Sequence, residues 1–140
     1  MVVRAEVVRR KLHEIEEAVA HLRSWAVTQE ALERDRQLRW AVERGLQVAA
    51  EALFDTGAHI LAAEFQETVD EYREIPGRLL GRGVISAATA DRLKGLAGFR
   101  NVLVHDYAEV DLGRVLAGVD RLGDFDAFVA DVATFLSRRL

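Results

Sequence analysis

The stretch EALERDRQLRWAVERGLQVAAEALFDTGAHILAAEF, residues 30–65, determines the fold class that we expect. Apolar and small side chains recur in it at intervals of three and four residues, the repeat of an amphipathic α-helix. They make one continuous seam: Leu38, Val42, Gly45, Ala49, Ala52, Thr56 and Ile60. We therefore predict one helix from Glu30 to Phe65, which would be the longest of the chain.

A second stripe of this predicted helix is polar and runs through Arg44, Gln47, Glu51 and Asp55. A face turned to solvent is the ordinary explanation of such a stripe. A face that lines a functional site is the alternative. The spacing alone leaves both open.

Four further helical segments flank the long one, and no segment alternates like a strand. Their ends carry capping residues, namely Ser, Thr or Asp before a first turn and Gly after a last one. The segments are Arg4–Ala26, followed by Thr28 as a cap or joint; Thr68 to Gly81, opened by the capping-box sequence Thr68-Val-Asp-Glu71; Ser86 to Leu103; and Asp111 to Leu136. The sequence predicts an all-α protein, an antiparallel bundle of about five helices.

The composition is that of a folded helical domain. Half of the 140 residues are apolar, 30% are charged, and there is no cysteine. The lack of cysteine excludes disulfides and thiolate metal sites and suits a reducing cytoplasm. No apolar run approaches the ~20 residues of a membrane span, and the mixed charges of Met1–Leu12 do not make a signal peptide. We expect one domain over residues 1–140, located in the cytoplasm and not in a membrane; the net charge of −4 argues against a general nucleic-acid coat protein.

The stretch FRNVLVHDY, residues 99–107, contains the candidate catalytic groups. Arg100 keeps its positive charge at any physiological pH, whereas His105 titrates near neutrality. Phosphodiester cleavage needs one group that stabilises negative charge and another that moves a proton. We therefore select Arg100 and His105 as catalytic candidates, with Asn101 and Tyr107 as supporting residues.

The spacing in this motif restricts how it can act. Residues five apart on an ideal helix point about 140° away from each other, so Arg100 and His105 do not share one narrow face. Both reach one phosphate only if the helix ends near Val104 or if two chains contribute. We expect both side chains at an exposed helix end, before a short loop. Alternatively, both residues have a structural role only. The helix dipole then favours a charged His105, and Arg100 pairs with an acid such as Asp106.

Two glycines, Gly95 and Gly98, lie just before this motif in the predicted helix. Each costs roughly 1 kcal/mol relative to alanine in a helix interior, so we expect a packing reason for them. Such glycines let another helix approach closely, either within the domain or across a dimer.

The remaining histidines, His13, His21 and His59, are dispersed over the predicted helices. None has a neighbouring carboxylate or histidine at a clear metal-ligand spacing. We interpret them as surface or core residues, and we predict neither a metal site nor a cofactor.

Three segments together resemble the HEPN superfamily, most closely its HepT type, the toxin half of HEPN–MNT toxin–antitoxin pairs. They are AVERGLQVAAEA at residues 41–52, Gly83-Val-Ile85, and GFRNVLVHDY at residues 98–107. The resemblance covers nearly the whole chain in order. Its most specific element is Arg-Asn-x3-His-x-Tyr in a helical context, while Arg44 and Glu51 match recurring positions without an assigned role.

The resemblance implies an antiparallel helical bundle that dimerises and brings two copies of the motif into one cleft. It also implies metal-independent RNA cleavage by Arg100 and His105, with Asn101 as the polar residue after the arginine. Tyr107 matches the tyrosine that an MNT nucleotidyltransferase antitoxin can modify with AMP to silence the toxin. The expected partners are therefore a second copy, that antitoxin and an RNA substrate.

Two other interpretations remain open at this stage. In one, the chain is a non-catalytic helical dimer subunit that holds a nucleotidyltransferase or binds nucleotide in the Arg100/His105 cleft. In the other, it is a structural adaptor in which both residues are ion-paired on the surface. RNA cleavage distinguishes the first from an enzyme, and loss of folding on mutation would favour the second.

Overall fold

The computed structural model describes residues 4–105 and 111–139, with His105 described by its backbone alone. These ranges hold eight α-helices, one 3₁₀ helix and no strand, so the all-α prediction is confirmed. In chain order the elements are α1 (Ala5–Ser24), α2 (Gln29–Arg34), α3 (Arg36–Phe65), η1 (Tyr72–Glu74), α4 (Ile75–Gly81), α5 (Ala87–Arg92), α6 (Leu96–His105), α7 (Leu112–Asp120) and α8 (Leu122–Arg139).

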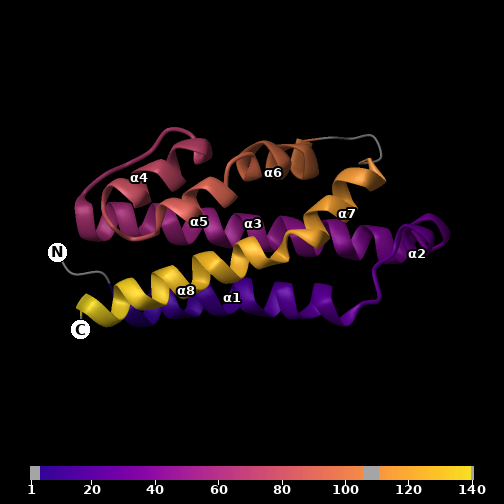
Figure 1. The fold of residues 1–140 in the computed structure, drawn as a ribbon, viewed down its shortest axis with the longest axis horizontal. Helices are drawn as coiled ribbons and strands as arrows, with labels where there is room; N and C mark the ends of the chain where they lie inside the picture. Colours follow the sequence, from indigo (N-terminus) through magenta and orange to yellow (C-terminus); the bar gives the residue numbers. More distant parts are fainter. Residues whose placement is uncertain (1–3, 106–110, 140) are drawn as a thin grey trace.

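Helix α3 runs through the centre of the bundle (Figure 1). It is antiparallel to α1, and α8 lies against α1 and also runs antiparallel to it. The shorter elements η1 and α4 to α7 lie on the other side of α3, and α6 packs directly on α3. None of the helices in the described ranges is long and apolar enough to cross a membrane.

The core is built from the apolar stripes of the three long helices. Side chains from α1, α3 and α8 form one buried cluster with those of the short helices. Its fully covered members include Val8, Ile15, Val42, Ala49, Leu53, Phe54, Ile60, Phe128 and Val132. Each large side chain of this kind stabilises the fold by roughly 1.5–3 kcal/mol when it leaves water. Because most residues of the seam predicted for the long helix are buried, that seam is confirmed as a core face.

The predicted helix Glu30–Phe65 is divided in the structure at Asp35. The Asp35 carboxylate accepts a hydrogen bond from the Leu38 backbone N–H at 3.1 Å and so caps α3. Thr28 likewise caps α2, accepting from the Ala31 N–H at 3.0 Å. An aspartate side chain can satisfy first-turn donors outside the helical conformation, which explains a break that the apolar repeat does not reveal.

Three other predicted segments are also divided. Thr68 was expected to open the third one, but the capping box lies three residues later, between Glu71 and Glu74, and opens η1. Ser86 and Asp111 cap α5 and α7 as predicted. The fourth segment breaks into α5 and α6 around Gly95, whose φ of +85° favours glycine. The last breaks at Arg121, between α7 and α8.

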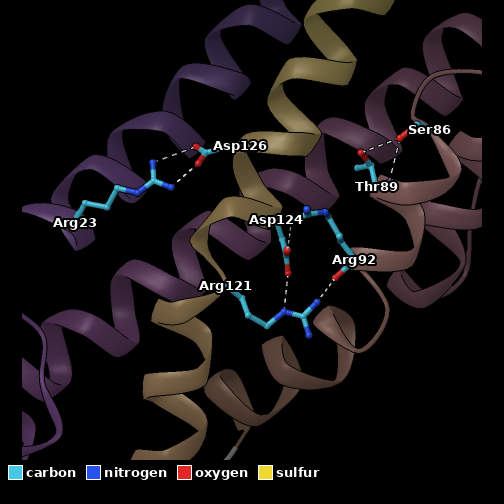
Figure 2. A network of polar contacts seen from close by, with 7 residues as sticks. All are labelled: Arg23, Ser86, Thr89, Arg92, Arg121, Asp124 and Asp126. Atoms are coloured by element: carbon cyan, nitrogen blue, oxygen red, sulfur yellow. Dashed lines mark hydrogen bonds and ion pairs between the residues drawn. The ribbon is translucent and has the colours of Figure 1, made fainter.

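A group of charged contacts fixes the start of α8 against two other helices (Figure 2). Arg23 of α1 forms a two-pronged ion pair with Asp126. Asp124, only 14% exposed, accepts from Arg121 at 2.7 Å and lies 3.4 Å from Arg92 of α5. Arg121 also donates to the Arg92 carbonyl at 2.7 Å, so α5 and the α7–α8 joint are tied together.

Gly57 allows α4 to pack closely on α3. A Cβ there would lie 2.5 Å from Ile75 Cγ2 and 3.1 Å from Leu79 Cδ1, two fully buried side chains. We predict that Gly57→Ala lowers the free energy of unfolding by about 1–3 kcal/mol, because the buried neighbours have no room to move. Urea unfolding measures this change.

Gly77 in α4 is the matched control, since a Cβ there would meet nothing within 4 Å. Gly77→Ala should raise stability by about 0.5–1 kcal/mol, the ordinary gain from alanine in a helix. Equal effects of the two substitutions would contradict the packing described for Gly57.

Candidate active site on helix α6

Arg100 lies in the middle of α6, and its side chain points toward α3. It is only 19% exposed, and its Nη2 lies 3.6 Å from Oε1 of Glu51. Its Nη1 donates to Oδ1 of the neighbouring Asn101 at 3.3 Å. The expectation that Arg100 occupies an exposed helix end is therefore wrong, because α6 packs on α3 and covers most of the side chain.

Glu51 resolves the question about the polar stripe of α3. It is half-buried and accepts a hydrogen bond from Nε2 of Gln47 at 3.0 Å. Arg44 and Asp55, at the two ends of the stripe, are exposed. The middle of the stripe thus faces the candidate site, and its ends follow the ordinary solvated explanation.

Tyr72 of η1 covers another side of Arg100. The guanidinium carbon lies 4.9 Å from the centre of the tyrosine ring, a cation–π distance. Behind this ring lies Phe54 of α3, with the two ring centres 5.0 Å apart and the planes 6° from parallel. The hydrogen bond from the Glu71 N–H to Glu74 Oε2 fixes the short turn that holds Tyr72 in this stack.

The Nε of Arg100 is buried and has no hydrogen-bond partner among the described residues. An unsatisfied buried donor costs about 1–3 kcal/mol, so folding stability alone does not account for an arginine in this place. Such a placement is typical of side chains that are retained for chemistry.

The face of α6 beside Arg100 is open. Gly98, Asn101 and the backbone of His105 follow each other at intervals of three and four residues and so share that face. Asn101 is exposed, and a Cβ on Gly98 would meet no atom within 4 Å. A hollow of about 600 Å³ adjoins it, lined by Asp70, Glu71, Tyr72, Arg73, Ala97, Gly98 and Asn101.

A second hollow of about 430 Å³ lies on the other side of Gly98, between α6 and the α7–α8 joint. It is mostly apolar and is lined by side chains such as Leu46, Phe99, Val102 and Phe125. The open face of α6 therefore lies between two hollows, neither of which another described segment fills.

Gly95 and Gly98 were expected to let another helix approach, either within the domain or across a dimer. Among the described residues no atom lies within 4 Å of a Cβ at either position, so the first alternative is not found there. Gly95 serves the turn between α5 and α6, with a positive φ. Contact of Gly98 with a second copy stays a prediction.

Helix α6 ends at His105, one residue beyond Val104, so the helix end that the motif predicts is found. On regular geometry Arg100 and His105 then start about 140° apart around the axis and about 7.5 Å apart along it. Both ways to join them on one phosphate, a helix end at this point and contributions from two chains, stay open on the described residues. Tyr107 and Asp106, the other partners considered for this motif, lie outside the described residues.

The other histidines agree with their interpretation as surface or core residues. His13 is exposed beside Glu17, and His21 stacks on Trp25. Burial lowers the pKa of His59, and the positive charge of Lys11 lowers it further. Among residues 4–105 and 111–139, no group of three His, Cys, Asp or Glu side chains has the arrangement of a metal site.

Sequence reasoning missed Tyr72 as a neighbour of Arg100. The two residues lie far apart along the chain, and nothing in the local pattern around η1 indicates their contact. Glu51 did give a signal, since it belongs to a polar stripe on an otherwise buried helix.

The family match covers most of the chain. Residues 15–132 match the family model described as Ribonuclease HepT-like. The chain is also 32% identical over 97 residues to the mRNA nuclease HepT of Shewanella oneidensis, an alignment that covers 69% of this chain and 73% of the relative. The protein belongs to the HepT-like ribonuclease family, and it is an enzyme of the endoribonuclease class.

Solved structures show the same fold. The tri-AMPylated Shewanella oneidensis HEPN toxin, in complex with MNT antitoxin, superposes with a TM-score of 0.83 at 25% identity. That alignment covers 94% of this chain and 99% of the toxin. YutE of Bacillus subtilis, a cytosolic protein of unknown function, has a TM-score of 0.85 at 19% identity over 99% of this chain and 94% of YutE, and it supports the fold alone.

Proposed function

We propose that this protein is the toxin half of a toxin–antitoxin pair and acts in the cytoplasm as a homodimeric, metal-independent endoribonuclease. Arg100 and His105 are its catalytic residues, Asn101 and Tyr107 support them, and no cofactor takes part. The observation that carries this proposal is the placement of Arg100. Its guanidinium is held by Glu51, Asn101 and Tyr72 at the border of an open helix face, in a family of ribonucleases.

The cleft is formed between two copies of the chain. Within one copy, Arg100 and His105 are both on α6, and positions five apart on a regular helix are separated by about 140° around its axis. The face with Gly98 and the exposed Asn101 is open among the described residues, and in this proposal a second α6 packs on it. Two-fold symmetry then brings two copies of the motif together.

The reaction is an attack of the RNA 2′-hydroxyl oxygen on the adjacent phosphorus. The bond from the 2′-oxygen to phosphorus forms, and the bond from phosphorus to the 5′-oxygen breaks. His105 of one subunit accepts the 2′-hydroxyl proton, and His105 of the partner subunit donates a proton to the departing 5′-oxygen. The products are a 2′,3′-cyclic phosphate and a 5′-hydroxyl.

Arg100 stabilises the charge that builds up on the phosphate oxygens in the transition state. Its planar fork of N–H donors matches a phosphate, and the charge does not depend on pH. Because Arg100 supplies the positive charge and His105 moves the protons, each requirement of the reaction has a protein group. Asn101, exposed beside Arg100, orients the phosphate or the imidazole.

The test is incubation of the purified protein with total RNA in the presence of EDTA. The native chain should cleave RNA to 5′-hydroxyl ends, and His105→Ala should reduce the rate by about 100- to 10,000-fold. His13→Ala is the matched control, because His13 is an exposed histidine on α1. Equal cleavage by native and His105→Ala protein would remove His105 from the mechanism, and no cleavage by native protein would favour a non-catalytic subunit.

The partner that silences this toxin is an MNT-type nucleotidyltransferase antitoxin, which attaches AMP to Tyr107. The tri-AMPylated state of the matched HEPN toxin supports this part of the proposal. The phenol oxygen of Tyr107 attacks the α-phosphorus of ATP, pyrophosphate leaves, and the phenol proton is lost. Since Tyr107 follows His105 by two residues, the added anion occupies the phosphate site and excludes RNA by size and charge.

Tyr107→Phe should resist this silencing. Incubation of native protein with the cognate nucleotidyltransferase and ATP should add the mass of AMP to a peptide containing Tyr107, with RNase activity falling as the modified fraction rises. The chain has only two tyrosines, so Tyr72→Phe is the matched control and should still accept AMP. An adduct that leaves cleavage unchanged, or no adduct on the Tyr107 peptide, would contradict the regulatory role.

A further inference from the structure

The guanidinium of Arg100 is supported from the side of α3 and from η1. Glu51 lies 3.6 Å from Nη2, and the ring of Tyr72 lies under the guanidinium carbon at 4.9 Å. A separation of 3.6 Å is an ion pair but exceeds a normal hydrogen bond. Glu51 therefore attracts the Nη2 group without using its N–H donors fully, and these remain able to bind a phosphate.

Both supporting groups are themselves held in place. Gln47 donates to the same Oε1 of Glu51 that faces Arg100, at 3.0 Å. The Tyr72 ring lies flat on Phe54, which is fully buried in the core. The capping box of η1 fixes the backbone on which Tyr72 stands. These contacts restrict the movement of Glu51 and Tyr72. Because both side chains contact the guanidinium of Arg100, its position depends on how they pack on α3.

The contacts are unlike those of an ordinary structural ion pair. A stabilising arginine would use its N–H donors in short hydrogen bonds, whereas Arg100 has a long ion pair, a 3.3 Å hydrogen bond and a buried Nε without a partner among the described residues. An arginine that is oriented but incompletely paired is suited to accept an anion.

We infer that Tyr72 and Glu51 are positioning residues for Arg100, setting the orientation in which its free donors meet the scissile phosphate. This inference rests on the proposed function, in which Arg100 stabilises the transition state. Neither residue touches the RNA in this account. Their effect is on the rate of the chemical step, because a displacement of about 1 Å at a catalytic group can reduce the rate about 100-fold.

Glu51→Gln tests the charge, because the amide has nearly the same shape as the carboxylate but lacks its negative charge. With a single-stranded RNA oligonucleotide as substrate, we expect kcat to fall by about tenfold, with KM unchanged or lower because a negative charge near the phosphate has been removed. Asp55→Asn is the matched control, since Asp55 is an exposed acid one turn further along α3. It should leave both constants as in the native protein.

Tyr72→Ala and Tyr72→Phe test the ring. The alanine variant should lower kcat by about 10- to 100-fold, and phenylalanine should recover most of that loss, because the contact with Arg100 is made by the ring. Melting temperatures accompany each variant, so that a loss of folding is recognised. Failure of phenylalanine to rescue a folded alanine variant would overturn the ring's role.

Arg100→Ala separates this inference from the proposed function. If Arg100→Ala is inactive while Glu51→Gln and Tyr72→Ala keep native kcat, the positioning role is refuted and the proposed function stands. A rise of KM with native kcat in Glu51→Gln also refutes it, since Glu51 would then act on RNA binding. Native activity of Arg100→Ala would refute the proposed function itself, and the positioning role with it.

Discussion

Replacing Arg100 with alanine should lower RNA cleavage by about 100- to 1,000-fold, the usual effect of removing one charge-stabilising group from a transition state. It should also lower the free energy of unfolding by about 1 kcal/mol, because the half-buried Glu51 would keep its hydrogen bond from Gln47 but lose the attraction of the guanidinium. The second effect follows from the structure and not from the sequence, which indicated an exposed arginine whose removal changes stability little. Cleavage assays and urea unfolding of the same preparation measure both.

Arg100→Lys separates charge from geometry. Lysine keeps the positive charge near Glu51 but lacks the planar fork that matches a phosphate. We expect this variant to recover most of the stability and little of the activity. If lysine restores cleavage to near the native rate, a simple positive charge is sufficient, and the bidentate role of Arg100 is wrong.

Most helix caps and the buried face of α3 were predicted correctly from the sequence. Thr28, Ser86 and Asp111 cap helices as expected, because a cap depends only on a side-chain oxygen and the N–H groups of the next turn. The buried seam of α3 was also predicted, since an apolar repeat reports directly which face leaves water.

Features that depend on contacts distant in sequence were not predicted. Tyr72 contacts Arg100 because the segment after α3 folds back and packs on Phe54. No local sequence pattern indicates this fold-back. Glu51 was visible as part of a stripe but could not be separated from a solvated face. Gly57, whose missing Cβ admits α4, was not singled out. For Gly95 and Gly98 the sequence left packing within the domain and packing across a dimer both open, and the first is not found among the described residues.

The family was visible in the motif itself, but the way in which its catalytic side chains meet was not. Arg100 and His105 are both on α6, and positions five apart on a regular helix are separated by about 140° around its axis. We therefore propose that the catalytic cleft requires groups from two copies.

A heterodimer of one native chain and one Arg100→Ala/His105→Ala chain tests this claim. Two different affinity tags allow its isolation, and a heterodimer of two differently tagged native chains is the control for full activity. If each chain had its own complete site, the mixed dimer would keep about half of the native rate, because one of its two symmetric sites would be intact.

The deciding measurement is the EDTA-resistant cleavage rate of this purified mixed dimer. We expect a rate at least about 100-fold below that of the native control, close to that of the doubly substituted homodimer. A rate near half of the native value would contradict it.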